Sequence, residues 1–168
     1  MGKGTVTDRI AARDVAAYLR AQFKVVFPGV KFSVRSKGSS WIDVEWVDGP
    51  TEEGVKEVTR PVRGGHQDPY SKNYVSAAPV TIVVRGVSIT GDPVIGGFHY
   101  RRNFSDAVRE AALKKWMEVH PGMDMEEAAY RWHDSVAVGK VVIRNGNLDG
   151  QVEQIAKLVI LPALAADK

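Results

Sequence analysis

The stretch that decides the fold lies between residues 27 and 51 and reads Phe27-Pro28-Gly29-Val30-Lys31-Phe32-Ser33-Val34-Arg35-Ser36, then Lys37 and Gly38-Ser39-Ser40, then Trp41-Ile42-Asp43-Val44-Glu45-Trp46-Val47-Asp48-Gly49-Pro50-Thr51. Pro28-Gly29 ends a preceding helix, and Asp48-Gly49-Pro50 ends a strand before a helix that Thr51 caps. Between these breaks, apolar and polar residues alternate with the period of a strand. The stretch therefore predicts a β-hairpin between two helices.

Side-chain parity predicts how the two strands of this hairpin pair. A three-residue turn, Gly38-Ser39-Ser40, keeps the apolar residues of both strands on one face, which a two-residue turn would not do. The predicted core-facing pairs are Phe32 with Trp46, Val34 with Val44 and Ser36 with Ile42, and the predicted outward pairs are Arg35 with Asp43 and Lys37 with Trp41.

The segments flanking the hairpin predict a helix on each side. Residues 8–26 have helical periodicity, with Thr7 as the expected N-cap. Residues 52–59 predict a short helix with two glutamates in its first turn, where the helix dipole favours them. Residues 63–79 contain glycines and prolines without a clear period and predict a long loop.

The rest of the chain predicts further strands and helices. Residues 80–90 form a β-branched run that predicts one central strand buried on both faces, and a turn at 91–93 leads to a strand over 94–103. Helices are expected over 105–120, with Ser105 as the N-cap, over 124–137, with Asp124 as the N-cap, and over 149–161. Residues 140–144 fit either a strand or the end of a helix. The fold class is α+β.

The expected architecture is a single domain over residues 1–168. Residues 1–62 form an α-β-β-α unit, 63–79 the loop, and 80–168 a second hairpin with helices. This second hairpin extends the same antiparallel sheet, and the C-terminal helices pack on one of its faces.

Composition limits the class of protein. The chain has 168 residues, no cysteine and a net charge of +3. Residues 1–104 carry 15 basic and 10 acidic side chains, so a surface for a polyanion is expected in this part. The absence of cysteine, of a long apolar run and of an apolar leader predicts a cytoplasmic protein with no membrane partner.

Several basic and aromatic residues are candidates for nucleic-acid binding. Four cations fall on one flank of the predicted first helix, where they suit phosphate contacts or form a solvated face. Trp41 points outward and either stacks on a base or packs under a neighbouring segment. Arg101 and Arg102 precede the helix that Ser105 begins, and they either bind an anion or form ion pairs. The candidates are Arg9, Arg13, Arg20, Lys24, Trp41, Arg101 and Arg102.

Catalytic candidates are few. His66, Asp68 and Tyr70 lie close together in the long loop, and His99 lies in the strand beyond it. The histidine spacings do not fit a metal site, and the chain has no phosphate-binding loop, dinucleotide fingerprint or hydrolase elbow. We expect no cofactor and no metal.

Residues 27–36 and 41–51 also carry a family resemblance. The chain resembles the large polyvalent protein associated domain family, number twenty-nine, mainly over residues 8–62. The segments that carry the resemblance are Phe-Pro-Gly, Ile-Asp-Val and Trp-Val-Asp-Gly-Pro-Thr, all quoted above. The Arg-Arg-x-x-Ser segment, residues 101–105, is similar to a later part of that family. The resemblance implies a phage, conjugative-element or actinobacterial context, with a role in protecting invading DNA or manipulating the host.

The resulting functional hypothesis is a non-enzymatic phage or mobile-element accessory protein that binds a nucleic acid or a host protein, with counter-defence as one role. Two alternatives stay open. One is a small enzyme that acts on nucleic acid or nucleotide through the 64–70 loop and the 98–102 strand. The other is a structural interaction module. If the protein is phage-encoded, it works in the host bacterial cytoplasm.

Overall fold

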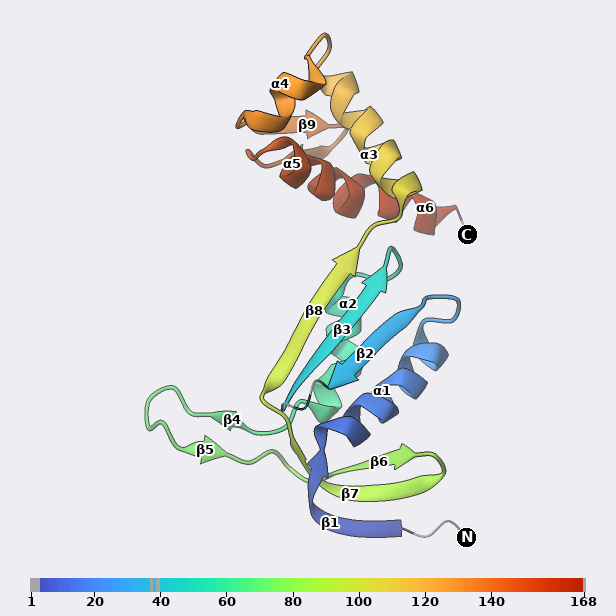
Figure 1. The fold of residues 1–168 in the computed structure, drawn as a ribbon, viewed down its shortest axis with the longest axis vertical. Coiled ribbons are helices and arrows are strands. Elements are labelled where there is room, and N and C mark those ends of the chain that lie inside the picture. Colours follow the sequence, from blue (N-terminus) through green and yellow to red (C-terminus); the bar gives the residue numbers. More distant parts are fainter. Residues whose placement is uncertain (1–3, 37, 39, 168) are drawn as a thin grey trace. The chain divides into compact units, whose positions relative to one another are not determined.

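The computed structural model describes residues 4–36, 38 and 40–167, and by its contacts the chain divides into two compact units, Met1–Asn103 and Phe104–Lys168 (Figure 1). Each unit has its own buried apolar core. Helices and small sheets both contribute, so the α+β class is confirmed. The arrangement differs from the expected single domain, because the C-terminal helices pack around a core of their own.

The first sheet contains the predicted hairpin. Its strands are β2 (Phe32–Ser36), β3 (Trp41–Val47) and β8 (Gly97–Asn103), with β3 in the centre. The antiparallel register of β2 and β3 is the predicted one over the described residues. Lys37, and Ser39 of the predicted turn, lie outside the described residues. In contrast, β8 pairs with β3 in parallel, so the prediction of one antiparallel sheet is wrong.

A second sheet has the order β1-β7-β6, formed by β1 (Gly4–Ala11), β7 (Val87–Val94) and β6 (Val80–Val84). The single strand expected over 80–90 is therefore a hairpin. Its turn is Arg85-Gly86, where both residues have positive φ, 50° and 79°. The turn expected at 91–93 is also wrong, because β7 continues through these residues and pairs in parallel with β1.

The first helix, α1 (Ala12–Val26), begins later than predicted. Thr7 lies in β1 and is not an N-cap, and Ala11 stands at the cap position. Pairing with β7 draws residues 4–11 into a strand, a tertiary effect that local periodicity does not reveal. The buried face of α1 joins the core shared by both sheets, in which Val15, Leu19 and Phe23 are completely buried.

The segment between the hairpin and the second sheet is partly as predicted. α2 (Glu52–Thr59) has the expected bounds, and the Thr51 hydroxyl accepts a hydrogen bond from the Gly54 N–H. A 3-10 turn, Arg60–Val62, follows. The predicted long loop contains a small hairpin of β4 (His66–Gln67) and β5 (Tyr74–Val75).

The second unit contains the predicted helices, but some of them end at residues other than the predicted ones. Ser105 caps α3 (Asp106–Val119) and Asp124 caps α4 (Met125–Tyr130), as predicted, but α4 ends before residue 137. The undecided segment, residues 140–144, contains the strand β10 (Val141–Ile143), which forms a hairpin with β9 (Val136–Val138). The last helical segment continues past Pro162 as α5 (Leu148–Ile155), a π-helical stretch (Ala156–Ile160) and α6 (Leu161–Ala166).

Trp46 anchors the core of the first unit. Its ring is 1% exposed and stacks on Phe32 at 5.7 Å between ring centroids, and Phe32 stacks on Phe23 at 4.3 Å. The indole N–H donates to the Pro50 carbonyl at 3.0 Å. This side chain therefore joins α1, the hairpin and the turn before α2.

We predict that Trp46→Ala lowers the free energy of unfolding by about 3–5 kcal/mol, because it leaves a large cavity and removes the hydrogen bond to Pro50. Chemical denaturation followed by circular dichroism measures the change. Trp132→Ala is the matched control, since Trp132 is 70% exposed. A loss below about 1 kcal/mol for Trp46→Ala would contradict the structure.

Candidate binding face around Trp41

One side of the β2-β3-β8 sheet turns away from the core. Because side chains alternate along a strand, every second residue of each strand lies on this side. We name it the outer face, and it is formed by Ser33, Arg35, Trp41, Asp43, Glu45, Val47, Gly97, His99, Arg101 and Asn103.

Trp41 is the large apolar residue of the outer face. Its side chain is 43% exposed, and its ring stacks on the His99 ring at 4.6 Å between centroids and 14° between planes. His99 Nδ1 lies 3.1 Å from Asp43 Oδ1. Gly97, opposite Trp41 in the register, makes room for the indole, because a Cβ there would lie 2.6 Å from the ring.

The charges of the outer face are mixed. Arg101 lies 3.7 Å from Glu45, and Arg35 is opposite Asp43 in the register, as predicted. The Arg101 side chain remains 72% exposed. The face thus combines a half-exposed aromatic stack with partly neutralised charges, a combination that suits binding better than acid–base chemistry.

A cavity of about 670 Å³ lies beside Trp41, where β8 begins. Its walls also include Arg63, His66 and the rings of Phe98 and Tyr100. Arg63 was not among the candidates predicted from the sequence. It lies directly before Gly64-Gly65, and this glycine pair marks a loop but does not indicate a binding residue.

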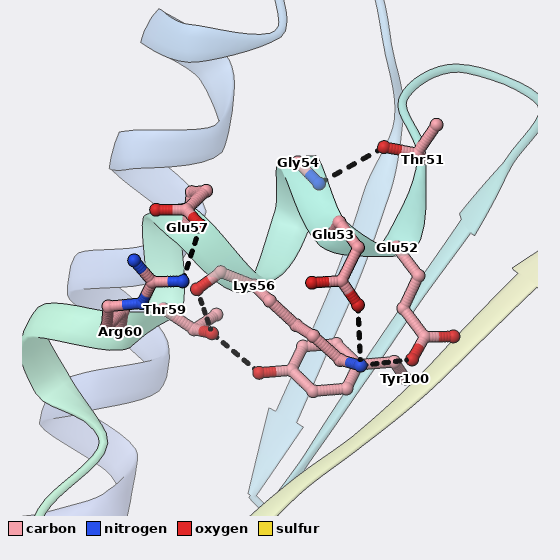
Figure 2. Close-up of polar contacts among 9 residues, drawn as sticks. All are labelled: Thr51, Glu52, Glu53, Gly54, Lys56, Glu57, Thr59, Arg60 and Tyr100. Carbon is pink, nitrogen blue, oxygen red and sulfur yellow. Dashed lines mark hydrogen bonds and ion pairs between the residues drawn. The ribbon is translucent and has the colours of Figure 1, made fainter.

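Tyr100 is held in the cavity wall by α2 (Figure 2). Its hydroxyl lies 2.6 Å from Thr59 Oγ1, and Thr59 donates its own proton to the Lys56 carbonyl, so Tyr100 is the donor. Lys56 Nζ lies 5.7 Å from the centre of the Tyr100 ring and forms ion pairs with Glu52 and Glu53. Burial raises the pKa of Tyr100, and the charges of Arg63 and Lys56 partly offset this rise.

The four catalytic candidates do not form hydrogen bonds between their side chains in the described part of the chain. The Asp68 carboxylate accepts the backbone N–H groups of Ser71 and Tyr70, which lowers its pKa. The Tyr70 side chain is 94% exposed. His66 lines the cavity, whereas His99 pairs with Asp43 on the outer face.

The predicted basic stripe is not one helical face, and this is a correction. Arg9 lies in β1, because the first helix begins only at Ala12. Arg20 donates twice to the Val34 carbonyl, at 2.7 and 3.0 Å, and so ties α1 to β2. The remaining members, Arg13 and Lys24, are exposed on α1.

Arg102 also holds the backbone. Its guanidinium donates to the carbonyls of Asp48 and Gly49 at 3.0 and 2.7 Å, which fixes the turn after β3. Burial lowers the pKa of Arg102, and the Asp48 charge partly offsets this shift. Of the two predicted anion-binding arginines, only Arg101 lies on the outer face.

Among the described residues, no three histidine, aspartate or glutamate side chains come together as a metal-binding group. Over the same residues, no helix combines the length and the apolar character needed to cross a bilayer.

The first unit is a family domain. The family model described as large polyvalent protein associated domain 29 matches residues 10–105, more than half of the chain, and the protein belongs to this family. The match ends two residues beyond the boundary of the first unit at Asn103. The suspected family is thus confirmed, and the match extends past the hairpin through β8. Comparisons with curated proteins and with solved structures found no match.

We predict that Arg20→Ala lowers the free energy of unfolding by about 1–2 kcal/mol, because it removes two charge-assisted hydrogen bonds to Val34. Lys24→Ala is the matched control on the same helix, because Lys24 makes no ion pair in the described part of the chain, and it should change stability by less than about 0.5 kcal/mol. Equal effects of the two substitutions in urea denaturation would show that the Arg20 tether contributes nothing.

Proposed function

We propose that this protein is a non-enzymatic accessory protein of a phage or other mobile genetic element and that it binds a macromolecule through the outer face. The observation that carries the proposal is the half-exposed Trp41 ring stacked on His99. Exposed aromatic rings supply much of the energy in both protein and nucleic-acid recognition. Membership of the polyvalent-protein-associated family supports the mobile-element context.

The partner is a nucleic acid or a host protein, and the surface suits either. Bases stack on aromatic rings without strict sequence preference. A protein partner would use the tryptophan and Arg101 as anchors, surrounded by polar residues. Within a host bacterial cytoplasm, such binding would serve counter-defence by shielding invading DNA or by occupying a host protein.

The enzyme alternative receives less support from the side chains. Asp68 caps a turn with its carboxylate, Tyr70 projects into solvent, and His99 is engaged by Asp43 and Trp41. A proton-transfer site needs its groups within hydrogen-bond reach or one water apart. We therefore place the function in binding.

We predict that immobilised protein captures a partner from host lysate and that Trp41→Ala abolishes the capture. Trp132→Ala, which removes an exposed tryptophan from the second unit, should capture as wild type does. Capture is measured by quantitative mass spectrometry and nucleic-acid staining, with and without nuclease treatment, on variants whose circular dichroism matches wild type.

The two lysate treatments separate the partners. Loss of capture after nuclease treatment identifies nucleic acid, and retention identifies a protein. Equal capture by wild type and Trp41→Ala would contradict the outer face as the binding surface. Absence of any specific capture would favour the structural module.

A further inference from the structure

The cavity beside Trp41 has the size and the lining of a small-ligand site. Its volume of about 670 Å³ lies within the range of about 300–1,000 Å³ that is usual for ligand pockets. It lies within the first unit, between the start of β8 and residues 63–67. The family domain therefore contains the whole site.

Close backbone approach shapes the walls of the cavity. A Cβ at Gly64 would lie 2.5 Å from the Pro93 carbonyl oxygen, and a Cβ at Gly97 would overlap the Trp41 ring. A Cβ at Gly65 would meet the Val75 carbonyl oxygen at still closer range. These positions accept only glycine, so the walls there are main chain and the space remains open.

Aromatic rings contribute to the lining of the cavity. Trp41, Phe98 and Tyr100 all contribute, and Trp41 is the most exposed of the three. His99, whose ring stacks on the indole, is not among the residues that line the cavity. A flat unsaturated ring is the ligand group that stacks best on such a surface.

The Arg63 guanidinium supplies a positive charge at the cavity wall. His66 and Gln67 also line the cavity, and no carboxylate is among the lining residues. The Arg63 side chain forms no ion pair within the described part of the chain. Its positive charge lies close enough to the Tyr100 hydroxyl to offset part of the rise in the pKa of that group. An arginine with open donors is suited to a phosphate, which it can hold through two parallel hydrogen bonds.

We propose that this cavity binds one nucleotide unit, with the base stacked on Trp41 and the phosphate held by Arg63. The inference rests on the proposed function and deepens it, because it names the chemistry that the binding face recognises. A free nucleotide and an unpaired nucleotide within a single strand present the same base and phosphate. Both sources therefore use the same residues.

The test measures binding of two probes, a fluorescent short oligothymidylate by anisotropy and uridine monophosphate by calorimetry, at low and moderate salt. The purified full chain is used as wild type, Arg63→Gln and Trp41→Leu. The matched controls are Arg60→Gln, which removes a neighbouring arginine that pairs with Glu57, and Trp132→Leu in the second unit. Circular dichroism confirms the folding of each variant.

We expect wild type to bind and both controls to bind equally well. Trp41→Leu should weaken binding about tenfold or more, as for the loss of one base stack. In a plot of the logarithm of the oligonucleotide binding constant against the logarithm of the salt concentration, Arg63→Gln should reduce the magnitude of the slope by about 0.7. This is the contribution of one phosphate contact in a single strand. Binding of both probes identifies a nucleotide site open to free ligand, and binding of the oligonucleotide alone identifies single-stranded nucleic acid as the source.

Two results would overturn the inference: neither probe binds at low salt, or both bind equally to wild type, Arg63→Gln and Trp41→Leu. The proposed function is judged separately by the lysate experiment. If neither probe binds but a protein is still captured through Trp41 after nuclease treatment, the nucleotide site is wrong and the proposed function stands. If capture is also independent of Trp41, both fail.

Discussion

The structure depends on the alternation of side chains along β3, the central strand of its sheet. Ile42, Val44 and Trp46 lie in the core, and every residue between them lies on the other side. A shift of the register by one residue would expose the large apolar ring of Trp46 and bury the charged side chains of Asp43 and Glu45. Both changes would destabilise the folded state. The same constraint that packs the core therefore places Trp41 on the outer face.

The neighbour of β3 decides what surrounds that tryptophan. Parallel pairing with β8 places Gly97 opposite Trp41 and His99 opposite Asp43, so one strand supplies both the room for the indole and its stacking partner. On the inner side, the same strand presents Tyr100, which Thr59 holds in the cavity wall. Fold and candidate site thus share β8 as a common element.

Local signals were sufficient for the hairpin, for the caps at Thr51, Ser105 and Asp124 and for the outward position of Trp41. Pairings between distant segments were not predictable from periodicity. The β1–β7 contact converts residues 4–11 into a strand, and this change removes Arg9 from the predicted basic stripe. Arg20 resembled a phosphate ligand in the sequence, but a backbone carbonyl accepts its hydrogen bonds. Gly86 is a turn signal inside the β-branched run, because glycine readily accepts the positive φ that the turn of the β6–β7 hairpin requires.

We propose that Trp41 is the tryptophan that contacts the ligand, and fluorine NMR of protein labelled with 5-fluorotryptophan tests this most directly. The four tryptophan resonances are assigned by single substitutions and followed while a short oligothymidylate is added. We predict that the Trp41 resonance shifts, whereas those of Trp46, Trp116 and Trp132 stay in place. A shift of the Trp132 resonance alone, or no shift at saturating oligonucleotide, would contradict it.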